Sequence, residues 1–321
     1  MRPMQRLFYT NPVYAEYFAD PFCFRYEGLY YAIGTSPADH GEHVFRMLRS
    51  NDLVNWTPLG GALRRPAGIG TDFWAPEIAF ESGRFWMYYS VGQGDKGHQL
   101  RVAASDRPEG PYEDLGRLSD ENCSFAIDAS PFRDDDGLWY LFYARDFLDT
   151  ARPGTALVVE PLSAMDRLSH QPEVVMRATQ DWQRYLKDRT MYGAVYDWHT
   201  LEGPCVRKHE GRYYCFYSGG NWTNETYGLD YVVSDDPLGP YEGSDSPMPR
   251  TLKTVPGKVL GPGHNSIVEG PDGSDYIVYH AWDPEMTARR MCIDKLVWTP
   301  LGPRCLGPTY GPTEILVERE A

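Results

Sequence analysis

Asp128-Ala-Ser-Pro-Phe-Arg-Asp-Asp-Asp-Gly137-Leu-Trp-Tyr140 is one copy of a pattern that occurs five times along the 321-residue chain. In every copy a polar residue opens a short segment, and a glycine with an aromatic residue close behind it follows 6 to 9 positions later. The polar residues are 51 to 74 positions apart and are Asp20, Glu77, Asp128, Glu202 and His264. Strand-and-turn repeats of this length are typical of β-propeller blades. The sequence therefore predicts an all-β, five-bladed β-propeller.

Each repeat continues in the same order after its glycine. A third apolar segment follows, as in Leu100-Arg-Val-Ala-Ala104, and then a turn and a short outer strand. The turn is itself repeated, because Ser105–Tyr112 and Ser234–Tyr241 are identical at six of eight positions. Glycine and proline in these turns separate the strands. We therefore expect four antiparallel strands in each blade.

Two segments fall outside the repeat. Residues 58–75 are expected to connect the first two blades, and residues 171–200 form an insertion between the third and the fourth. The insertion is rich in aromatic residues, which argues against disorder, and it ends directly before Glu202. Long loops on a rigid scaffold are usually functional, so we expect it at the rim of a site. No linker indicates a second domain, and residues 1–321 are predicted to form a single catalytic domain.

Composition excludes some classes of protein. The formal net charge of −14 argues against a nucleic-acid partner, whose phosphates require a basic surface. No run of 18 apolar residues is present, so no membrane partner is expected. The first ten residues contain basic residues but no apolar stretch of the kind found in signal peptides, which predicts a cytoplasmic location.

The six cysteines have no spacing typical of a zinc site. Cys205 and Cys215 lie on one predicted hairpin, but a two-residue turn at Glu210-Gly211 would set Cys205 opposite Phe216. A disulfide between them is therefore disfavoured, and reduced, mostly buried thiols are expected.

The carboxylates among the five leading residues suggest a reaction. The innermost strand of a propeller blade runs beside the central channel, so the five leading residues should gather there. Glycoside hydrolysis with inversion needs a carboxylate to activate water and a carboxylic acid to protonate the leaving oxygen. A third carboxylate nearby raises the pKa of the acid by repulsion between like charges. The four leading carboxylates, Asp20, Glu77, Asp128 and Glu202, can therefore supply these three groups.

The motifs together resemble those of glycoside hydrolase family 43. They are Ala19-Asp-Pro21, Trp74-Ala-Pro-Glu77, Ile127-Asp-Ala-Ser-Pro131, Glu202-Gly-Pro204 and Gly261-Pro-Gly-His-Asn265. The resemblance spans the whole chain in order and implies a five-bladed propeller that acts as an inverting arabinofuranosidase, arabinanase or xylosidase. It also implies that Asp20 is the general base, that Glu202 is the general acid, and that Asp128 orients the acid and raises its pKa.

The same resemblance extends to candidate substrate-binding residues. His264 matches a histidine at the channel that in several members helps to hold a metal ion or water, which makes Ca²⁺ the candidate ion although no cofactor is required. Arg290 matches an arginine that contacts sugar hydroxyls, with Arg289 as the alternative. Trp74 is either a platform for a sugar ring or core between blades, and Glu77 is either a wall of the site or a structural strut.

The predicted function is release of terminal pentose, most plausibly α-L-arabinofuranosyl, from oligosaccharides of plant-type polysaccharides. An endo-arabinanase or a β-xylosidase of the same family is the alternative. A carbohydrate-binding propeller is the non-enzyme alternative, although binding alone does not require three axial carboxylates. A retaining fructan hydrolase and a six-bladed sialidase are disfavoured by their different motifs. The chain stops soon after the fifth blade, so no C-terminal β-sandwich is expected to cover the site. The sequence does not decide the oligomeric state.

Overall fold

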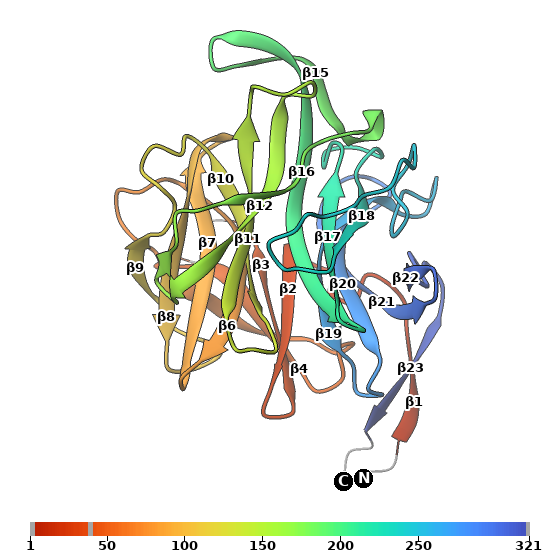
Figure 1. Ribbon diagram of the computed structural model, residues 1–321. Coiled ribbons are helices and arrows are strands. Elements are labelled where there is room, and N and C mark those ends of the chain that lie inside the picture. Colours follow the sequence, from red (N-terminus) through yellow and green to blue (C-terminus); the bar gives the residue numbers. More distant parts are fainter. Residues whose placement is uncertain (1–3, 38–40, 319–321) are drawn as a thin grey trace.

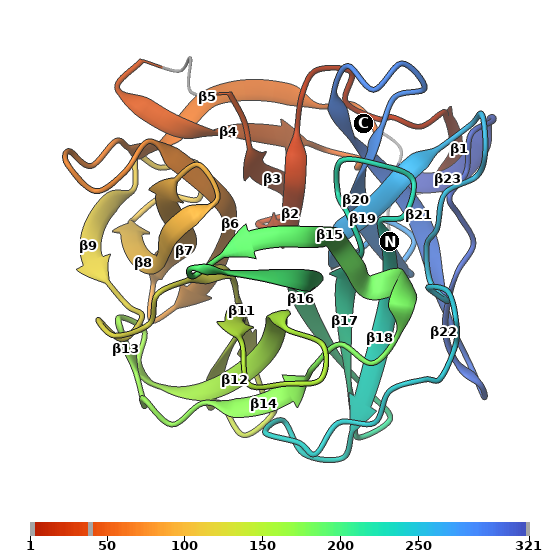
Figure 2. The ribbon, with the colours of Figure 1, turned by 90° about the horizontal axis from the view of Figure 1, so that it is seen from above.

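The structure is a computed structural model that describes residues 4–37 and 41–318, and its regular elements are almost all β-strands (Figure 1). The described residues contain no α-helix and one short 3₁₀ helix, η1 (Asp181–Gln183). Viewed from above, the strands form blades arranged around a common centre (Figure 2). The predicted all-β, five-bladed propeller is confirmed.

Three blades are four-stranded antiparallel sheets in sequence order. The first contains β2 (Ala19–Tyr26), β3 (Leu29–Thr35), β4 (His43–Ser50) and β5 (Thr57–Arg64). The second contains β6 (Asp72–Glu81), β7 (Arg84–Gln93), β8 (Lys96–Ser105) and β9 (Glu113–Arg117). The fifth contains β19 (Leu260–Glu269), β20 (Asp275–Trp282), β21 (Arg289–Thr299) and β22 (Gly302–Cys305). Residues 58–64, expected to belong to a connection, thus lie in β5, the outer strand of the first blade.

The third and fourth blades share one nine-stranded sheet. The third contains β10 (Ala126–Arg133), β11 (Trp139–Phe147), β12 (Gly154–Ala164), β13 (Arg167–Leu168) and β14 (Glu173–Met176). The fourth contains β16 (Ala194–His209), β17 (Arg212–Gly219) and β18 (Gly228–Ser234). Beyond β18 only isolated bridges, Leu229 to Leu252 and Val233 to Glu242, continue the fourth blade within the described residues. The predicted fourth strand of this blade is thus reduced to two bridges, and Pro247 and Pro249 lie between the residues that form them.

The aromatic insertion also differs from the expectation. Its first part is β14, which is the outer strand of the third blade and pairs with β12. Only the part after η1 leaves the repeat: β15 (Arg184–Met191) pairs antiparallel with the first half of β16 to form a hairpin. This hairpin stands above the ring of blades (Figure 1). Because β16 is 16 residues long, the same strand carries the hairpin and enters the fourth blade.

Five apolar clusters hold the ring together, one at each interface between neighbouring blades. Between the first and second blades, for example, Tyr31 and Ile33 pack with Phe85 and Met87. A fully buried side chain of this size contributes about 2–3 kcal/mol. The interface between the fifth and first blades closes the ring, and there the backbone N–H of Phe18 donates to the Arg289 carbonyl at 2.8 Å. Strand β1 (Met4–Tyr9) pairs with β23 (Thr313–Glu318) outside the ring.

The prediction for the cysteines is confirmed. Cys205 lies opposite Phe216 in the β16–β17 register, as the two-residue turn requires. All six cysteines are free thiols.

Candidate active site

A β-bulge interrupts each of the five innermost strands, and because β16 also forms the hairpin, its bulge lies in the middle of that strand. All five bulges lie at the same end of the channel. The first residue of each bulge is left-handed, with φ between 46° and 60°, and these residues are Asp20, Ala75, Asp128, Gly203 and His264. Bulges re-aim side chains and are frequent beside active sites. The position that repeats in all five blades is therefore the first residue of the bulge. Glu202 precedes this position by one residue, and Glu77 follows it by two.

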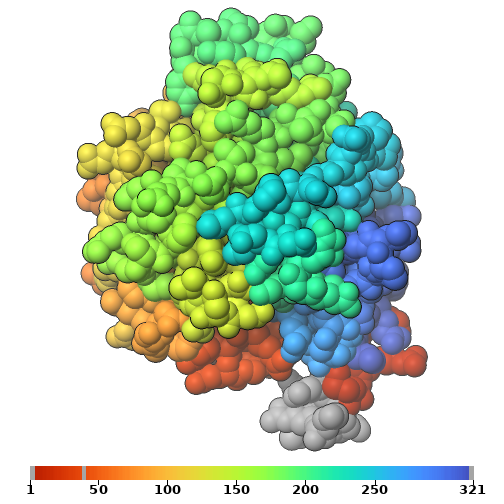
Figure 3. Space-filling model, viewed as in Figure 1, coloured from red at the N-terminus to blue at the C-terminus, as the bar shows by residue number. Residues whose placement is uncertain are grey.

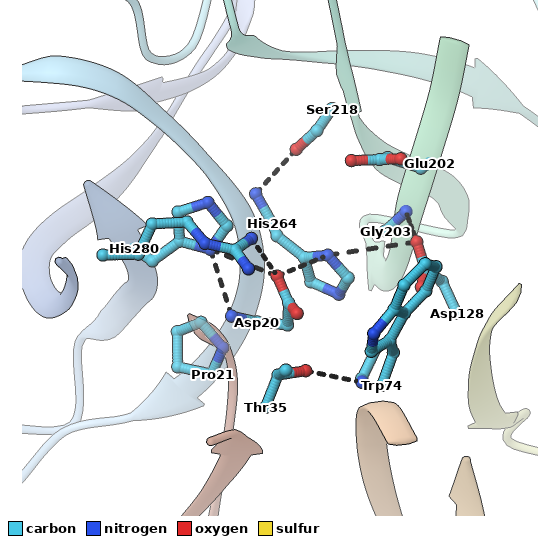
Figure 4. Close-up of polar contacts among 12 residues, drawn as sticks. Asp20, Pro21, Thr35, Trp74, Asp128, Glu202, Gly203, Ser218, His264 and His280 are labelled. Carbon is cyan, nitrogen blue, oxygen red and sulfur yellow. Dashed lines mark hydrogen bonds and ion pairs between the residues drawn. The ribbon is translucent and has the colours of Figure 1, made fainter. Parts of the chain in front are cut away.

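Asp20 is the most heavily contacted of these residues (Figure 4). Its Oδ1 lies 3.3 Å from Nη1 of Arg289 and 3.3 Å from Nδ1 of His264. Its backbone N–H donates to Nδ1 of His280 at 3.0 Å. Burial opposes ionisation of Asp20, but the charge of Arg289 and the two histidines outweigh it and hold the pKa of this carboxyl well below its usual range. Asp20 is therefore a carboxylate at neutral pH.

Asp128 and Glu202 have the opposite electrostatic environment. Burial raises the pKa of Asp128 well above its usual value, and repulsion from Glu202 and Asp20 raises it further. Burial likewise raises the pKa of Glu202 to about 7, although the Tyr227 hydroxyl, which donates to its Oε1 at 2.7 Å, lowers it. Glu202 is thus available as a proton donor near neutral pH, while Asp20 is not.

A hydrogen bond from Gly203, in the fourth blade, reaches Asp128 in the third blade. The Gly203 N–H donates to Oδ2 of Asp128 at 2.9 Å, which fixes the Asp128 carboxyl beside the backbone that carries Glu202. Gly203 has a φ of 56°, and a Cβ there would lie 3.1 Å from the His264 ring. Both the backbone conformation and the close approach of His264 therefore favour glycine after Glu202.

The two histidines of the cluster are buried, and burial lowers the pKa of both, that of His280 to about 4. The backbone N–H of His264 donates to Oγ of Ser218 at 2.7 Å, which ties β19 to β17. Nδ1 of His280 accepts the Asp20 N–H and lies 3.3 Å from Asp20 Oδ1, which fixes the ring beside this residue. The histidines therefore position Asp20 without adding a permanent charge.

Of the two adjacent arginines, the structure brings Arg289 to the cluster. Arg289 is held by Tyr17, whose hydroxyl accepts from Nη2 at 2.7 Å, and its guanidinium lies 4.5 Å from the centre of the Trp222 ring. Arg290 instead pairs with Asp283 at 3.1 Å. Neighbouring residues of a strand point to opposite faces, so only one of the two can reach Asp20. The preference for Arg290 is corrected to Arg289.

Trp74 and Glu77 both come from β6 but lie at different depths. The Trp74 ring is partly exposed and lies beside Asp128 (Figure 4). It stacks on His98 with ring centres 3.7 Å apart. Glu77 lines a cavity of about 660 Å³ at the other end of the channel, formed by the second halves of the inner strands. Burial raises the pKa of Glu77 to about 8. Glu77 thus stands below the cluster, whereas Trp74 borders it.

Four residues of the site were missed in the sequence: Tyr17, Trp222, Tyr227 and His280. Each lies outside the repeated motif, since Tyr17 precedes the first inner strand and Trp222 and Tyr227 lie between β17 and β18. The signal available for Tyr227 and His280 was a polar aromatic residue within or beside an apolar strand, a pattern shared by many other tyrosines of this chain.

The Ca²⁺ prediction gains no support from protein ligands. Within residues 4–37 and 41–318 no group of three or more His, Cys, Asp or Glu side chains is arranged to hold a metal ion. His264 is surrounded instead by Asp20 and Asp128, at 3.3 and 3.9 Å. An ion here would depend mainly on water for its coordination.

Comparison with known proteins finds a matching family and similar chains. The profile of Glycosyl hydrolases family 43 matches residues 9–302. The chain is 31% identical over 313 residues to the Beta-D-galactofuranosidase xynD of Aspergillus niger, a match that covers 91% of this chain and 83% of that protein. A solved structure of a thermostable family-43 glycoside hydrolase is similar with a TM-score of 0.84 and 32% identity, and the match covers 98% of this chain and 100% of that chain.

Further relatives correct the predicted location. Two extracellular exo-alpha-(1->5)-L-arabinofuranosidases, from Streptomyces avermitilis and Streptomyces chartreusis, and an extracellular endo-alpha-(1->5)-L-arabinanase from Bacillus subtilis are each 26% identical to this chain. The matches cover 85%, 85% and 87% of this chain and 56%, 82% and 85% of those proteins, in the same order. Their names point to secretion, so the prediction of a cytoplasmic location is wrong. No helix in the described parts of the chain is long and apolar enough to cross a bilayer.

Proposed function

The chain belongs to glycosyl hydrolase family 43, and on this premise we propose that it is an exo-acting enzyme that releases terminal α-L-arabinofuranosyl residues from oligosaccharides. Family 43 enzymes hydrolyse O-glycosyl bonds, need no cofactor and characteristically invert the anomeric centre. The observation that carries the assignment of roles is the contrast between a charged Asp20 and a Glu202 whose pKa is about 7.

In the proposed mechanism Asp20 removes a proton from the attacking water, and its low pKa keeps it ionised throughout the working pH range. Glu202 protonates the leaving oxygen from the opposite side of the sugar. The ionised Asp20 repels a second negative charge and so helps burial to keep Glu202 protonated, while the bond from the Gly203 N–H to Asp128 orients the segment that carries the acid. Arg289 and Trp74 are proposed to contact the sugar, Arg289 through hydroxyls and Trp74 through its ring face.

Exo action is supported by the hairpin that rises beside the acid. β15 and the first half of β16 pass over the middle of the ring in the view from above (Figure 2). Such a wall limits the site to the end of a chain. The Streptomyces relatives named exo-arabinofuranosidases agree with this choice, although the Bacillus subtilis relative is named an endo-arabinanase.

A β-D-galactofuranoside is the second candidate substrate, because the relative that is 31% identical is named a galactofuranosidase. A β-D-galactofuranosyl ring has the configuration of an α-L-arabinofuranosyl ring with an added hydroxymethyl group. Discrimination by one such group in a pocket amounts to roughly 10- to 200-fold. Both sugars are therefore compatible with the same catalytic residues.

The substrate proposal is tested with 4-nitrophenyl α-L-arabinofuranoside, β-D-galactofuranoside and β-D-xylopyranoside, followed by arabinohexaose. We expect the highest kcat/KM on the arabinofuranoside, arabinose as the only early product from the hexaose, and inversion at the anomeric carbon by time-resolved NMR. Highest activity on the galactofuranoside would select the second candidate. Activity confined to the xyloside, or early internal fragments, would reject the proposal.

The acid and base roles predict different losses for two variants. Glu202→Gln should lose about 10²–10⁴-fold in kcat/KM on arabino-oligosaccharides, but keep most of its activity on a dinitrophenyl arabinofuranoside, whose leaving group needs no protonation. Asp20→Asn should lose activity on both substrates, because water must be activated in either case. Equal losses on both substrates for Glu202→Gln would remove it from the acid role.

The pKa of Glu202 predicts the alkaline limb of the pH profile. Because the protonated form is active, kcat/KM should fall above about pH 7, about tenfold per pH unit. Tyr227→Phe removes a hydrogen bond that lowers this pKa, so the limb should move to higher pH. Tyr213→Phe is the matched control, since the Tyr213 hydroxyl donates to Asp134 away from the site. A limb that Tyr227→Phe leaves in place would assign it to another group.

The two arginines predict a difference at acid pH. Arg289→Met removes the charge that lowers the pKa of Asp20, so burial should then dominate and move the acid limb of kcat/KM upward. Arg290→Met should leave that limb unchanged, because its partner is Asp283. Arg289→Lys, which keeps the charge, should move it less than Arg289→Met. Thermal unfolding of each variant controls for loss of the fold, and equal profiles for both Met variants would contradict the assignment.

A further inference from the structure

The hairpin of residues 184–199 is poorly packed for an element that borders a buried site. It rises clear of the blades in the space-filling view (Figure 3), and three of its apolar side chains, those of Leu186, Tyr192 and Val195, are 46%, 46% and 61% exposed. Only Met191 and Trp198 of its apolar residues are buried. Apolar burial therefore cannot by itself fix where this hairpin lies above the channel.

Two polar ties connect the hairpin to blades other than its own. Nη2 of Arg189 lies 2.6 Å from Oδ2 of Asp95, which is in the turn between β7 and β8 of the second blade. The Tyr192 hydroxyl donates to Oδ2 of Asp146 at 2.7 Å, on β11 of the third blade. The hairpin thus starts from the fourth blade and is attached to the second and third.

The Arg189 side chain is held in place by its own hairpin. Its guanidinium lies 5.0 Å from the centre of the Tyr185 ring and 5.1 Å from that of Trp198, and its side chain is only 13% exposed. Asp95 is 59% exposed, and exposed ion pairs usually contribute little because of solvent screening and side-chain entropy. Here the two rings fix the arginine before it pairs, so less entropy is lost when the tie forms.

A cavity lies beneath the tip of the hairpin. It has a volume of about 380 Å³ and is lined by the turn at 95–97, by Ser124 and Phe125, and by residues 190–193. The tip therefore does not rest on the second and third blades by close packing. The Arg189–Asp95 and Tyr192–Asp146 contacts span this gap.

Tyr185 interacts electrostatically both with the Arg189–Asp95 ion pair and with Glu202. Burial raises the pKa of the Tyr185 phenol, Arg189 lowers it, and Glu202 and Asp95 both raise it, so this phenol is within electrostatic reach of the acid and of the tie. The Tyr185 carbonyl accepts from Nδ2 of the buried Asn221 at 2.9 Å, which fixes the base of the hairpin near Glu202. A displaced tip would therefore move the wall of the pocket while its base stays in place.

From these contacts we infer that the Arg189–Asp95 ion pair determines exo specificity by holding the hairpin across the side of the pocket that faces the second blade. Arg189 and Asp95 are positioning residues that touch no reacting atom. With the tie formed, the pocket admits a chain end; with the tie broken, the hairpin swings outward and an internal segment of the chain can enter. The inference rests on the proposed exo function and assigns its structural cause.

The test compares Asp95→Asn and Arg189→Gln with wild type. On a 4-nitrophenyl glycoside, which occupies only the pocket, kcat/KM should stay within about twofold. On arabinohexaose and linear arabinan, internal fragments should appear and the rate relative to the aryl glycoside should rise about tenfold, a change in KM more than in kcat. Hydrogen exchange of the 186–195 backbone should accelerate about tenfold.

Two further variants make the comparison specific. Asp95→Glu keeps the charge and should retain the wild-type product pattern. Asp197→Asn removes the partner of Arg184, a pair confined to the hairpin at 3.6 Å, and should change neither products nor exchange. Unchanged products and exchange in Asp95→Asn and Arg189→Gln would overturn the inference, as would the same change in Asp197→Asn.

Failure of the proposed function would look different. If wild type hydrolyses no arabinofuranoside, the substrate assignment fails, and the tie is then tested by exchange and by chain-length dependence on whichever glycoside the wild type does hydrolyse. Faster exchange without any change in chain-length dependence would show that the tie holds the hairpin but does not set specificity, which also overturns the inference.

Discussion

Three carboxyl groups buried beside one channel repel one another, and the Arg289 guanidinium decides which of them carries the charge. Asp20 lies 3.3 Å from Arg289 and stays ionised although burial opposes it. Glu202 receives a hydrogen bond from the neutral phenol of Tyr227, and Asp128 receives one from a backbone N–H. These bonds lower the two pKa values, but burial outweighs them and raises both. In a buried site, differences of this kind separate pKa values by several units. The cation thus divides the channel into a charged side and a protonated side.

This division depends on the backbone as much as on the side chains. In a regular strand successive side chains point to opposite faces, here toward the two neighbouring blades. The bulge in each inner strand turns one side chain toward the axis instead, and Asp20, Asp128 and His264 adopt left-handed conformations to reach it. Such a conformation costs about 1 kcal/mol for a residue with a Cβ. The five apolar interfaces between blades offset this cost, and the ring cannot open without losing one of them.

Much of this arrangement could be predicted from the sequence, because a repeat reports both the strands and their order around the axis. The proximity of Asp20, Asp128 and Glu202 followed from their places in the repeated motif. The exact register did not, since a bulge at Ala75 moves Glu77 two residues down the channel and a single step along β21 decides between Arg289 and Arg290. The insertion was also misjudged, because β14 has no repeat signature and pairs with β12 through its position alone. Contacts between distant segments, such as Tyr17 with Arg289, leave no local pattern to find.

On the proposed function, the difference between the rigid channel and the hairpin of residues 184–199 accounts for how one fold serves several substrates. The channel is rigid because its residues are fixed by backbone bulges and by buried hydrogen bonds between blades, as in Gly203 to Asp128. The hairpin is attached by a few polar contacts across a cavity, among them Arg189 to Asp95. In the mechanism proposed above, a change in the channel would alter the charges on which the reaction depends, whereas a change in the hairpin would alter only what reaches them. Related enzymes can therefore differ in the chain ends or internal bonds they accept while the carboxyl groups stay in place.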